Sequence, residues 1–512
     1  MSQQILNLDE LATLEHRFQN QLPQAELMRR AGLAVATRIE NLCEAGCHVV
    51  FICGPGNNGG DGFAAARVLK EHGFRVTCCL IGCDKPKTED ALLMFNAWQA
   101  AGGTTIADPY MADKAEVVVD ALFGTGLCKP LKGDYLDAAM WFNERQAYHV
   151  SIDVPSGIDA MTGHWVGGAL GCMADLTVAM FSPKAGCYIN DGADAAGRVE
   201  VDELGISVPL STLGLITPED FRHVLEFRRK NTHKGTYGHV AVIGGETGTV
   251  GAALIAARAA LTMGAGRVTV ELMSDKAPCV DVVYPELMFA QGEIDLTKTS
   301  CNVVGCGMGF SEKAKKRLID AINAPVPLIM DADALRMLAD DLNLQDMVLA
   351  RKAHTVITPH PGEAAAILRT TVEKVNADRV SQGRELSIQT GAISILKGAG
   401  SVVSLRSSRT WINPTGDASL ATAGSGDALA GMLGAFFAQD FDLVSATLAA
   451  VWLHGVSCVE DEGGFTARDI APAAARVLYD MRQQMYSTNP RSGGARYDHG
   501  FSSLFEQPEQ EL

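Results

Sequence analysis

The chain has 512 residues, too many for one hydrophobic core, because single cores stop growing at roughly 250 to 300 residues. Its composition, with 47% hydrophobic and 20% charged residues, is typical of a folded globular protein and excludes a largely disordered one. The formal net charge of -17 argues against nucleic acid and anionic membranes as partners, since both would repel the chain. We therefore expect two large domains that act on small molecules.

The cysteines and the N-terminus predict the compartment. The 13 cysteines lie in apolar segments such as residues 76–80, and they form no paired Cys-x-x-Cys zinc motif. We interpret them as buried thiols in a reducing environment. The N-terminus has no basic segment followed by an apolar one, and no stretch reaches the roughly 18 apolar residues of a membrane span. These features predict a cytoplasmic protein.

Predicted strands and helices alternate through the first half of the chain. Helical spacing covers residues 24–43 and 63–71. Short apolar strands are predicted at residues 48–53, 75–81, 117–122 and 148–153. Such alternation predicts an α/β domain with a doubly wound parallel sheet of the Rossmann-like kind.

Polar, glycine-rich turns follow three of these strands, at residues 57–62, 120–126 and 153–157. Open parallel sheets bind their ligands at the carboxyl ends of strands, so these turns predict a binding site. The first turn also contains three polar side chains, those of Asn57, Asn58 and Asp61. Side-chain oxygens in a glycine loop indicate either Asx turns or coordination of a cation, and the sequence leaves both open.

The same turn contains a dinucleotide-binding pattern. Gly54, Gly56 and Gly59 match Gly-x-Gly-x-x-Gly after a strand. In ordinary dinucleotide folds the second strand ends in an acidic residue that binds the ribose, and here Asp84 comes a few residues late. The pattern alone is therefore a weak indication of that function.

A second domain is predicted after residue 216. Residues 201–215 lack a strong periodic pattern, and Thr217 followed by Pro218 is typical of a helix start. The predicted domains are 1–216 and 217–486, followed by a polar tail at 487–512. Strands are predicted at residues 239–243, 267–272, 302–305, 327–330, 355–358 and 393–397, with a helix at 251–263. The second domain is thus also α/β and doubly wound.

The loop Thr422–Asp427 carries the clearest chemistry of the second domain. It reads Thr-Ala-Gly-Ser-Gly-Asp and precedes an apolar helix at residues 428–437. Backbone N–H groups at such a helix start bind anions, and glycines let a phosphoryl group approach closely. A carboxylate there would repel the phosphoryl group unless it is the general base for a hydroxyl that attacks phosphorus. The alternative is that Asp427 is an ordinary helix N-cap.

Two further glycine-containing turns follow strands of this domain, at residues 358–363 and 397–401. Three such turns on one domain favour a catalytic site over a simple helix cap. An isolated histidine such as His360 is more often structural than a ligand, but its place at a strand end favours a functional role. No Walker motif is present, which argues against a P-loop fold.

Together with residues 231–238, 244–252 and 413–416, these motifs resemble the ADP-dependent NAD(P)H-hydrate dehydratases of the ribokinase-like superfamily, over residues 221–478. The resemblance implies that Asp427 deprotonates the C6 hydroxyl of a hydrated nicotinamide, which then takes the β-phosphoryl group of ADP. The implied hydrate contacts are Ala252, Gly309, His360 and Asp427. The implied nucleotide-phosphate contacts are Lys397, Gly398, Ala399, Gly400, Ser401 and Gly426. Mg²⁺ is expected with ADP, held through water by Glu363.

Two positions depart from the pattern of that family. Its Gly-Pro-Gly-Leu-Gly loop is Gly-Cys-Gly-Met-Gly at residues 305–309, and the glycine usual before Gly424 is Ala423. The spacing of both motifs is kept, so the implied roles remain.

In the first domain, the segments 54–62, 120–127 and 153–157 resemble the NAD(P)H-hydrate epimerases, over residues 8–210. The resemblance implies K⁺ bound by Asn58, Asp120 and Ser156, whose oxygen atoms suit a hard cation. The implied hydrate contacts are Asn57, Asn58, Gly59, Gly60, Asp61, Gly124, Thr125, Gly126, Leu127, Cys128, Lys129, Pro130 and Asp153. Asp153 is the candidate for proton transfer, with Lys129 or Lys132 as its partner.

The two resemblances imply a bifunctional metabolite-repair enzyme whose substrates are NADHX and NADPHX, the hydrates of NADH and NADPH, and ADP. The first domain would interconvert the R and S hydrates, and the second would dehydrate the S hydrate while ADP becomes AMP and phosphate. The alternative is a ribokinase-like vitamin kinase fused to a Rossmann-like module that binds without catalysis. We also expect a homo-oligomer, with no nucleic-acid or membrane partner.

Overall fold

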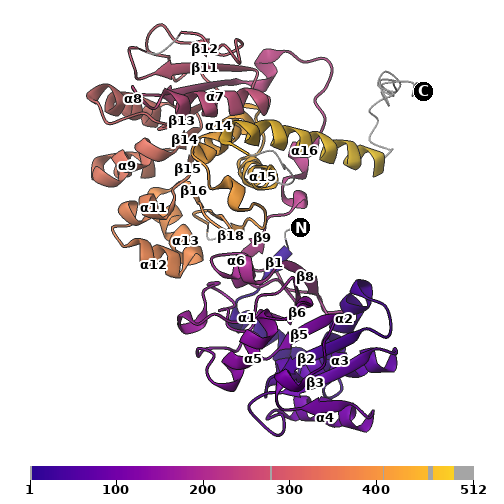
Figure 1. The fold of residues 1–512 in the computed structure, drawn as a ribbon. Coiled ribbons are helices and arrows are strands. Elements are labelled where there is room, and N and C mark those ends of the chain that lie inside the picture. The colour runs from indigo at the N-terminus through magenta and orange to yellow at the C-terminus, as the bar shows by residue number, and fades with distance from the viewer. Residues whose placement is uncertain (1–2, 277–278, 408, 459–464, 489–512) are drawn as a thin grey trace, which may run out of the picture.

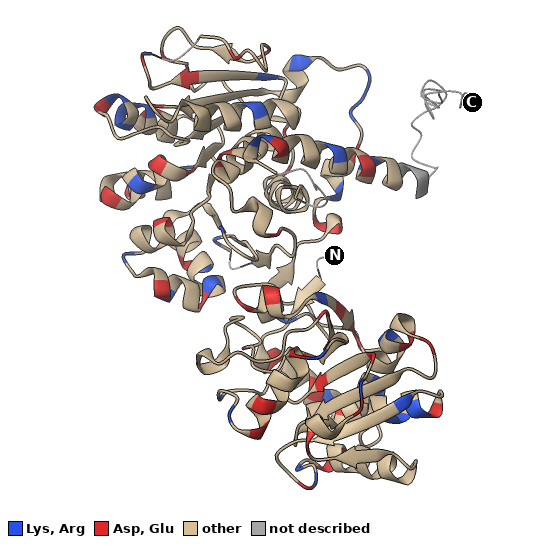
Figure 2. Ribbon diagram, in the orientation of Figure 1, with Lys and Arg blue, Asp and Glu red and all other residues tan. Residues whose placement is uncertain are grey.

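The computed structural model describes residues 3–276, 279–407, 409–458 and 465–488. They form two α/β units, each built on its own sheet (Figure 1). The predicted fold class, two doubly wound α/β units, is confirmed. Residues 489–512, most of the predicted tail, lie outside the described part of the chain. Figure 2 shows acidic and basic residues interspersed over both units.

The sheet of the first unit has seven strands, all parallel to their neighbours. From edge to edge they are β4 (Thr104–Ile106), β3 (Arg75–Leu80), β2 (His48–Cys53), β5 (Val117–Ala121), β6 (Tyr148–Ile152), β7 (Leu176–Met180) and β8 (Arg198–Asp202). The helices are α1 (Leu8–Gln19), α2 (Glu26–Leu42), α3 (Asn57–Glu71), α4 (Glu89–Ala100), α5 (Asp134–Asn143) and α6 (Gly192–Ala195). The chain runs outward from β2 to β4 and then returns to place β5 beside β2. The topological switch point therefore lies between β2 and β5.

The second sheet has eleven strands. In order they are β12 (Met288–Phe289), β11 (Arg267–Leu272), β10 (His239–Gly244), β13 (Cys301–Val304), β14 (Leu328–Met330), β15 (Thr355–Ile357), β16 (Ile393–Leu396), β17 (Val402–Ser404), β18 (Thr410–Ile412), β9 (Leu213–Leu215) and β1 (Gln3–Ile5). Strands from β12 to β16 are parallel, and β17 is antiparallel to both its neighbours. The switch point lies between β10 and β13.

Ten α-helices of the described residues belong to the second unit, and two of them pack closely on each other. They are α7 (Val250–Thr262), α8 (Glu312–Asn323), α9 (Ala332–Asp340), α10 (Leu342–Leu349), α11 (Pro361–Ile367), α12 (Val372–Ala377), α13 (Arg379–Thr390), α14 (Ser425–Ala438), α15 (Leu443–Val456) and α16 (Ala467–Thr488). A Cβ on Gly431 of α14 would lie 2.0 Å from the carbonyl oxygen of Ala256 in α7. The small residues of α14 thus let the two helices touch, which fixes the N-terminal end of α14 over the sheet.

Segments of the N-terminal half also take part in the second unit. β1 pairs antiparallel with β9, and β9 lies parallel to β18. Ala185 and Ile189, in and just after the 3₁₀ turn that follows β7, pack into the core of the second unit. The predicted boundary at residue 216 follows directly after β9, and the domain limits remain a prediction.

The predicted central strands are observed as β2, β3, β5, β6, β10, β11, β13, β14, β15 and β16. The sequence analysis missed β7, and it missed the edge strand β8 because Arg198-Val-Glu-Val-Asp202 has charged residues at alternate positions. The helix start at Thr217 forms the capping box with Asp220, but it opens a kinked 3₁₀ helix, Pro218–Leu225, and not an α-helix. None of the described helices is at once long and apolar enough to cross a bilayer.

Candidate active sites

A cavity of about 450 Å³ lies at the carboxyl ends of β2, β5 and β6, beside the switch point of the first sheet. The strand-end turns line it with Gly56, Asn57, Asn58, Asp61, Leu122, Phe123, Gly124, Thr125, Gly126, Leu127 and Asp153. Helices α1 and α2 contribute Glu15, Gln19, Leu27, Met28 and Ala31. Its size is in the range of small-molecule sites, and its position is the one expected for ligands of open parallel sheets.

The glycines of the first turn allow backbone segments to touch. A Cβ on Gly54 would lie 1.9 Å from the carbonyl oxygen of Leu122, and one on Gly59 would lie 2.0 Å from the carbonyl oxygen of Gly54. Side chains at these positions would separate the turns after β2 and β5. Because α3 begins at Asn57, the N-terminus of this helix lies at the cavity. Gly59 and the following Gly60 are buried and outside the cavity lining.

Asn58 is buried, yet its amide oxygen and nitrogen have no hydrogen-bond partner among the described residues. An unsatisfied buried polar atom costs on the order of 1–3 kcal/mol, so this side chain calls for a ligand. Ser156 donates two hydrogen bonds to Asp120, from Oγ at 2.7 Å and from the backbone N–H at 2.8 Å. Burial nevertheless raises the pKa of Asp120 above its ordinary value. A cation near these oxygens would favour the ionised carboxylate and satisfy the Asn58 oxygen.

Asp153 is held in a strained backbone conformation beside a buried lysine. Its φ of 71° lies in the left-handed region, which is costly for a residue other than glycine. Oδ1 forms an ion pair with Lys184, and Oδ2 accepts a hydrogen bond from the backbone N–H of Thr125 at 3.3 Å. The Lys184 side chain is only 2% exposed and also donates to the carbonyl oxygen of Met180 at 2.6 Å. The pair is therefore rigidly placed at the edge of the cavity.

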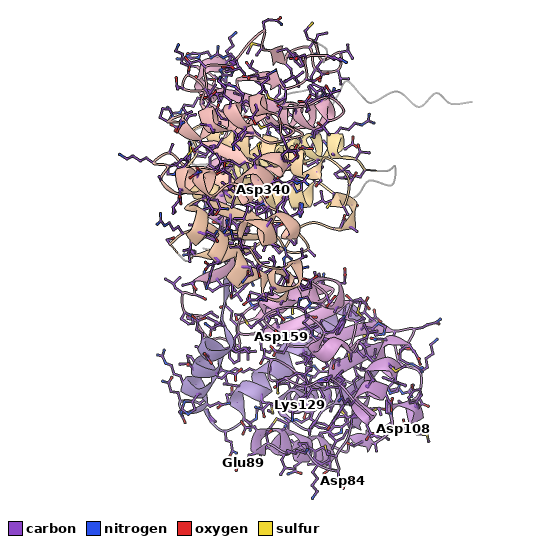
Figure 3. All side chains as sticks on the ribbon, turned by 90° about the vertical axis from the view of Figure 1, so that its left-hand side faces the viewer. Asp84, Glu89, Asp108, Lys129, Asp159 and Asp340 are labelled. Atoms are coloured by element: carbon purple, nitrogen blue, oxygen red, sulfur yellow. The ribbon has the colours of Figure 1, made fainter. Side chains whose placement is uncertain are left out.

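The lysine beside Asp153 is thus Lys184, and not Lys129 or Lys132 as the sequence suggested. Lys129 and Lys132 are exposed and lie outside the cavity lining. Figure 3 labels Lys129 in the first unit. The exposed Cys128 and the half-buried Pro130, which the sequence suggested as hydrate contacts, also lie outside the lining. Lys184 follows β7, which the sequence analysis did not assign. A lysine soon after an apolar strand was the signal that could have identified it.

Two more carboxyl groups at the cavity have raised proton affinity. Burial first, and then the charge of Asp153, raises the pKa of Asp61 well above its ordinary value. The same two causes raise the pKa of Glu15. Asp61 was predicted from its glycine turn, but Glu15 lies on α1 and matches no motif. The first site therefore combines one ion pair with two carboxyls that hold their protons more tightly than usual.

In the second unit, Asp427 is the third residue of α14. The N-cap is Gly424, at φ 90°, and it forms no side-chain cap. The alternative interpretation of Asp427 as the N-cap is therefore wrong. Burial, with a further contribution from the charge of Asp331, raises the pKa of Asp427 to about 6. A carboxylate with a pKa near neutrality is well suited to act as a general base.

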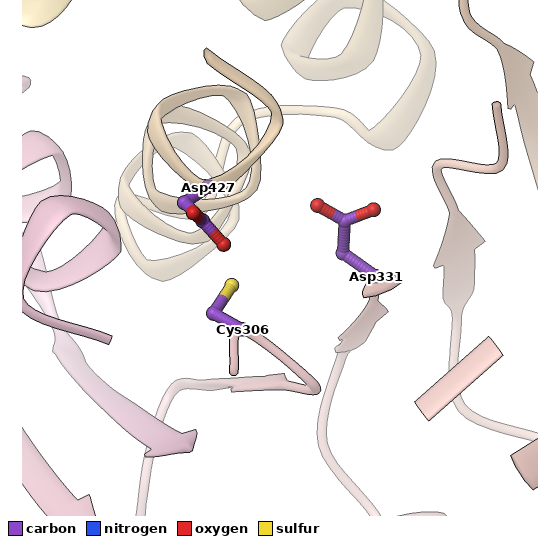
Figure 4. A group of neighbouring side chains, drawn as sticks. All are labelled: Cys306, Asp331 and Asp427. Atoms are coloured by element: carbon purple, nitrogen blue, oxygen red, sulfur yellow. The ribbon is translucent and has the colours of Figure 1, made fainter. Parts of the chain in front are cut away.

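Asp331, Lys397 and Cys306 surround Asp427, and the sequence analysis assigned no role to Asp331 or Cys306. Lys397 Nζ lies 2.9 Å from Asp331 Oδ1 in an ion pair whose carboxylate is buried. The Sγ atom of Cys306 and carboxylate oxygens of Asp331 and Asp427 lie within 4.8 Å of one another (Figure 4). Asp331 follows β14, Cys306 follows β13 and Lys397 follows β16. They converge because parallel strands end at the same edge of the sheet.

His360 caps α11 and is held by its neighbours. Its Nδ1 accepts a hydrogen bond from the N–H of Gly362 at 2.9 Å, and Glu363 accepts one from the His360 N–H at 2.9 Å. The imidazole is still 57% exposed, so a ligand can reach it. Burial raises the pKa of Glu363 to about 7, although the charge of Lys397 opposes the shift. His360 thus has a structural role that also fixes its ring at the site.

The turn at residues 398–401 rests on Arg379, which the sequence analysis did not identify. Arg379 donates to the carbonyl oxygen of Ala399, and burial lowers its pKa to about 10. The turn also contacts the first unit, because a Cβ on Gly400 would lie 2.0 Å from the carbonyl oxygen of Tyr188. A buried guanidinium beneath a glycine turn supplies positive charge to an anion bound there.

The remaining predicted residues lie at the same edge of the second sheet. Ala252 is in the first turn of α7, and the N–H of Gly309 donates to Asp333 Oδ2 at 2.9 Å. A Cβ on Gly426 would lie 2.9 Å from Lys397 Nζ, so a side chain there would displace the lysine. The structure thus gathers predicted residues from the loops after β10, β13, β15 and β16 at the start of α14.

Comparisons with known proteins match both units. The family described as NAD(P)H-hydrate dehydratase matches residues 240–467, and the family described as YjeF-related protein N-terminus matches residues 24–186. The bifunctional NAD(P)H-hydrate repair enzyme Nnr of Coxiella burnetii is 34% identical over 92% of this chain and 97% of its own length. The protein of the same name from Escherichia coli is 34% identical over 93% and 92%. The crystal structure of ADP/ATP-dependent NAD(P)H-hydrate dehydratase from Bacillus subtilis is 26% identical, with a TM-score of 0.46, and covers 52% of this chain and 98% of that one.

Proposed function

Because the chain belongs to the bifunctional NAD(P)H-hydrate repair enzymes, we propose that the sites at its two switch points divide one repair task between them. The chain is an enzyme that repairs hydrated NADH and NADPH. The first domain, residues 1–216, interconverts the R and S hydrates, and the second, residues 217–486, dehydrates the S hydrate as ADP becomes AMP and phosphate. The observation that supports this division is that each site has its own candidate carboxylate: Asp153, paired with Lys184, in the first and Asp427, with its raised pKa, in the second.

The reaction is tested by incubating the protein with ADP and hydrated NADH. Return of the NADH absorbance band, with one AMP formed for each NADH recovered, is the expected result. Phosphorylation of a vitamin alcohol without recovery of NADH would contradict the proposed function and would support the vitamin kinase that the sequence left open.

In the second domain, Asp427 takes the proton of the C6 hydroxyl as the hydroxyl oxygen bonds to the β-phosphorus of ADP. The bond from that phosphorus to the bridging oxygen breaks, and AMP leaves. Loss of the phosphate from C6 together with a proton from C5 then restores the ring double bond. Ala252, Gly309 and His360 are the residues that we expect to hold the ring beside Asp427, since all lie at the same sheet edge.

Nucleotide phosphates are proposed to bind between the start of α14 at Gly426 and the turn at residues 398–401. Arg379 and Lys397 supply positive charge there. Mg²⁺ bound with the nucleotide would supply positive charge that neutralises the phosphate groups. Glu363 is the carboxylate proposed to hold it through water, because its buried carboxyl would be stabilised in the ionised form by a nearby cation.

Dehydration should depend on pH through Asp427. The pKa of this carboxylate is raised from the ordinary value to about 6, and only its ionised form accepts a proton. The kcat/KM of dehydration should therefore be constant well above pH 6 and fall about tenfold per pH unit below it. The check is a pH profile measured with the S hydrate and excess ADP. A flat profile down to pH 5 would contradict the assignment of Asp427 as the base.

In the first domain, inversion at C6 requires the hydroxyl to leave one face of the ring and return on the other. Proton transfer to and from that oxygen needs an acid–base group at the cavity. Asp153 is the proposed group, and its ion pair with Lys184 holds the carboxylate in a fixed orientation. The hydrate is proposed to contact the predicted residues that line the cavity beside Asp153, namely Asn57, Asn58, Asp61 and residues 124–127.

Potassium is proposed to bind through oxygen atoms of Asn58, Asp120 and Ser156. The unsatisfied amide of buried Asn58 and the raised pKa of Asp120 both support a cation, and the set of one carboxylate with two neutral oxygens suits a monovalent ion. The bound ion would supply positive charge that holds the substrate in the cavity.

Replacing Asn58 with alanine should remove the stabilisation by potassium. An ion that binds only the folded chain adds RT ln(1 + [K⁺]/Kd) to the free energy of unfolding, about 2.7 kcal/mol at a hundredfold excess over Kd. The Tm should thus be higher in KCl than in choline chloride for the unchanged protein, and equal in both for Asn58→Ala. Asn57→Ala is the matched control, because the neighbouring Asn57 side chain is exposed, and this variant should keep the difference in Tm between the two salts. A difference that survives Asn58→Ala would place the ion elsewhere.

A further inference from the structure

The cluster of Cys306, Asp331 and Asp427 contains a thiol that the proposed reaction does not use (Figure 4). Its sulfur and carboxylate oxygens lie within 4.8 Å of one another, and among the described residues no other group of His, Cys, Asp and Glu side chains comes together in this way. The three residues come from the ends of two parallel strands and the start of α14, so the backbone positions are fixed by the core.

We propose that Cys306, Asp331 and Asp427 bind a soft divalent cation such as Zn²⁺, and that the bound ion blocks dehydration. Zinc bonds are about 2.3 Å to sulfur and about 2.0–2.2 Å to carboxylate oxygen, so the donors of one tetrahedral ion lie roughly 3.3–3.7 Å from each other. The three donor atoms all lie within 4.8 Å of one another, so side-chain torsions need to bring them together by roughly 1 Å. A water molecule would complete the four ligands that zinc prefers.

The charges around the cluster suit a divalent ion. Lys397 contacts Oδ1 of Asp331, so Oδ2 is the oxygen that we assign to the ion. Binding releases the proton of the Cys306 thiol to solvent and leaves a thiolate as ligand. Three anionic groups beside one ammonium then have a net negative charge, which the ion neutralises. Asp331 and Lys397 can therefore keep their ion pair when the divalent ion is bound.

The sulfur ligand determines which ions bind. Thiolate favours zinc and cadmium, whereas magnesium requires oxygen ligands in an octahedral arrangement. Magnesium bound with ADP should therefore not compete for this cluster. Because the ion occupies the oxygen of Asp427 that would accept the hydroxyl proton, dehydration stops while epimerisation in the other unit continues. This inhibition rests on the proposed role of Asp427, whereas binding of the ion does not.

The test compares inhibition and binding in the full-length protein and in Cys306→Ala. Dehydration is measured at constant Mg²⁺ and ADP with free Zn²⁺ set by a chelating buffer. Inhibition is expressed relative to the uninhibited rate of each protein. Loss of the sulfur should raise the half-inhibitory zinc concentration by roughly tenfold to a hundredfold or more, because even residues that only hydrogen-bond to a metal ligand contribute that much to metal affinity. Cys301→Ala is the matched control, because Cys301 is an equally buried thiol at the opposite end of β13. It should be inhibited like the unchanged protein.

Binding is measured separately by the ultraviolet charge-transfer band of cadmium thiolate. The band should be smaller in Cys306→Ala than in Cys301→Ala, and this readout holds even if the chain had no dehydratase activity. Equal inhibition and equal binding in the two variants would overturn the proposal. Inhibition of both activities at the same zinc concentration would overturn the assignment of the inhibitory ion to this cluster.

Discussion

Replacing Asp427 with alanine should lower the rate of hydrate dehydration by about 10²–10⁴-fold, the usual contribution of a positioned general base. Asp427 combines a pKa of about 6 with a place at the start of α14, where a phosphoryl acceptor is expected. The nearest carboxylate, Asp331, is held by Lys397 and is less free to take over the proton. Alanine is compatible with the helix, so the fold should be kept. The measurement is recovery of NADH from the S hydrate with excess ADP.

Epimerisation by the same preparation is the first control, because Asp153 lies in the other unit. Asp442→Ala is the second. Asp442 caps α15 by accepting hydrogen bonds from the N–H groups of Val444 and Ser445 at 3.2 and 3.1 Å. Its loss should cost about 0.5–2 kcal/mol of stability and leave dehydration intact. Normal dehydration by Asp427→Ala would refute the proposed base, and loss of both activities would mean that the units share a site or that the variant is unfolded.

Replacing Lys184 with methionine should lower the epimerisation rate by about 10²-fold or more. Lys184 is the buried counterion of Asp153, and methionine fills a similar volume without the charge. Without Lys184 the carboxylate is left without its ion pair and loses its orientation, so it no longer exchanges protons efficiently with the C6 hydroxyl. Asp153→Asn should be impaired as strongly, and the double variant little further, because the two groups act as a unit. The check is the rate at which a purified S hydrate equilibrates with the R hydrate.

Lys132→Met is the matched control for this prediction. Lys132 is exposed and outside the cavity lining, so its charge should have little effect on the rate. Dehydration serves as the folding control, because Ala185 next to Lys184 packs into the core of the second unit. Epimerisation at the normal rate by Lys184→Met would show that the ion pair is structural, and loss of rate in Lys132→Met would restore the partner that the sequence suggested.

The parts of both sites that could be predicted lie in turns directly after apolar strands. Asn58 and Asp153 each follow a buried strand, and the first turn of α14 contains Asp427. Glycine turns and strand periodicity are short-range patterns, so they identify such positions without knowledge of the fold. Glu15 and Arg379 lie on helices with no motif around them, and only the packing of those helices against the loops makes them part of a site.

The sequence by itself therefore determined the two doubly wound units, the strand ends that carry each site, and the candidate carboxylates Asp153 and Asp427. Only the tertiary structure decided their partners: Lys184 beside Asp153, and Cys306 with Asp331 beside Asp427. It also decided that β1 and β9 complete the second sheet. The physical reason is the range of the interactions. Hydrophobic periodicity and turn chemistry act between neighbours in the chain, whereas ion pairs, buried clusters and strand pairing depend on how distant segments assemble.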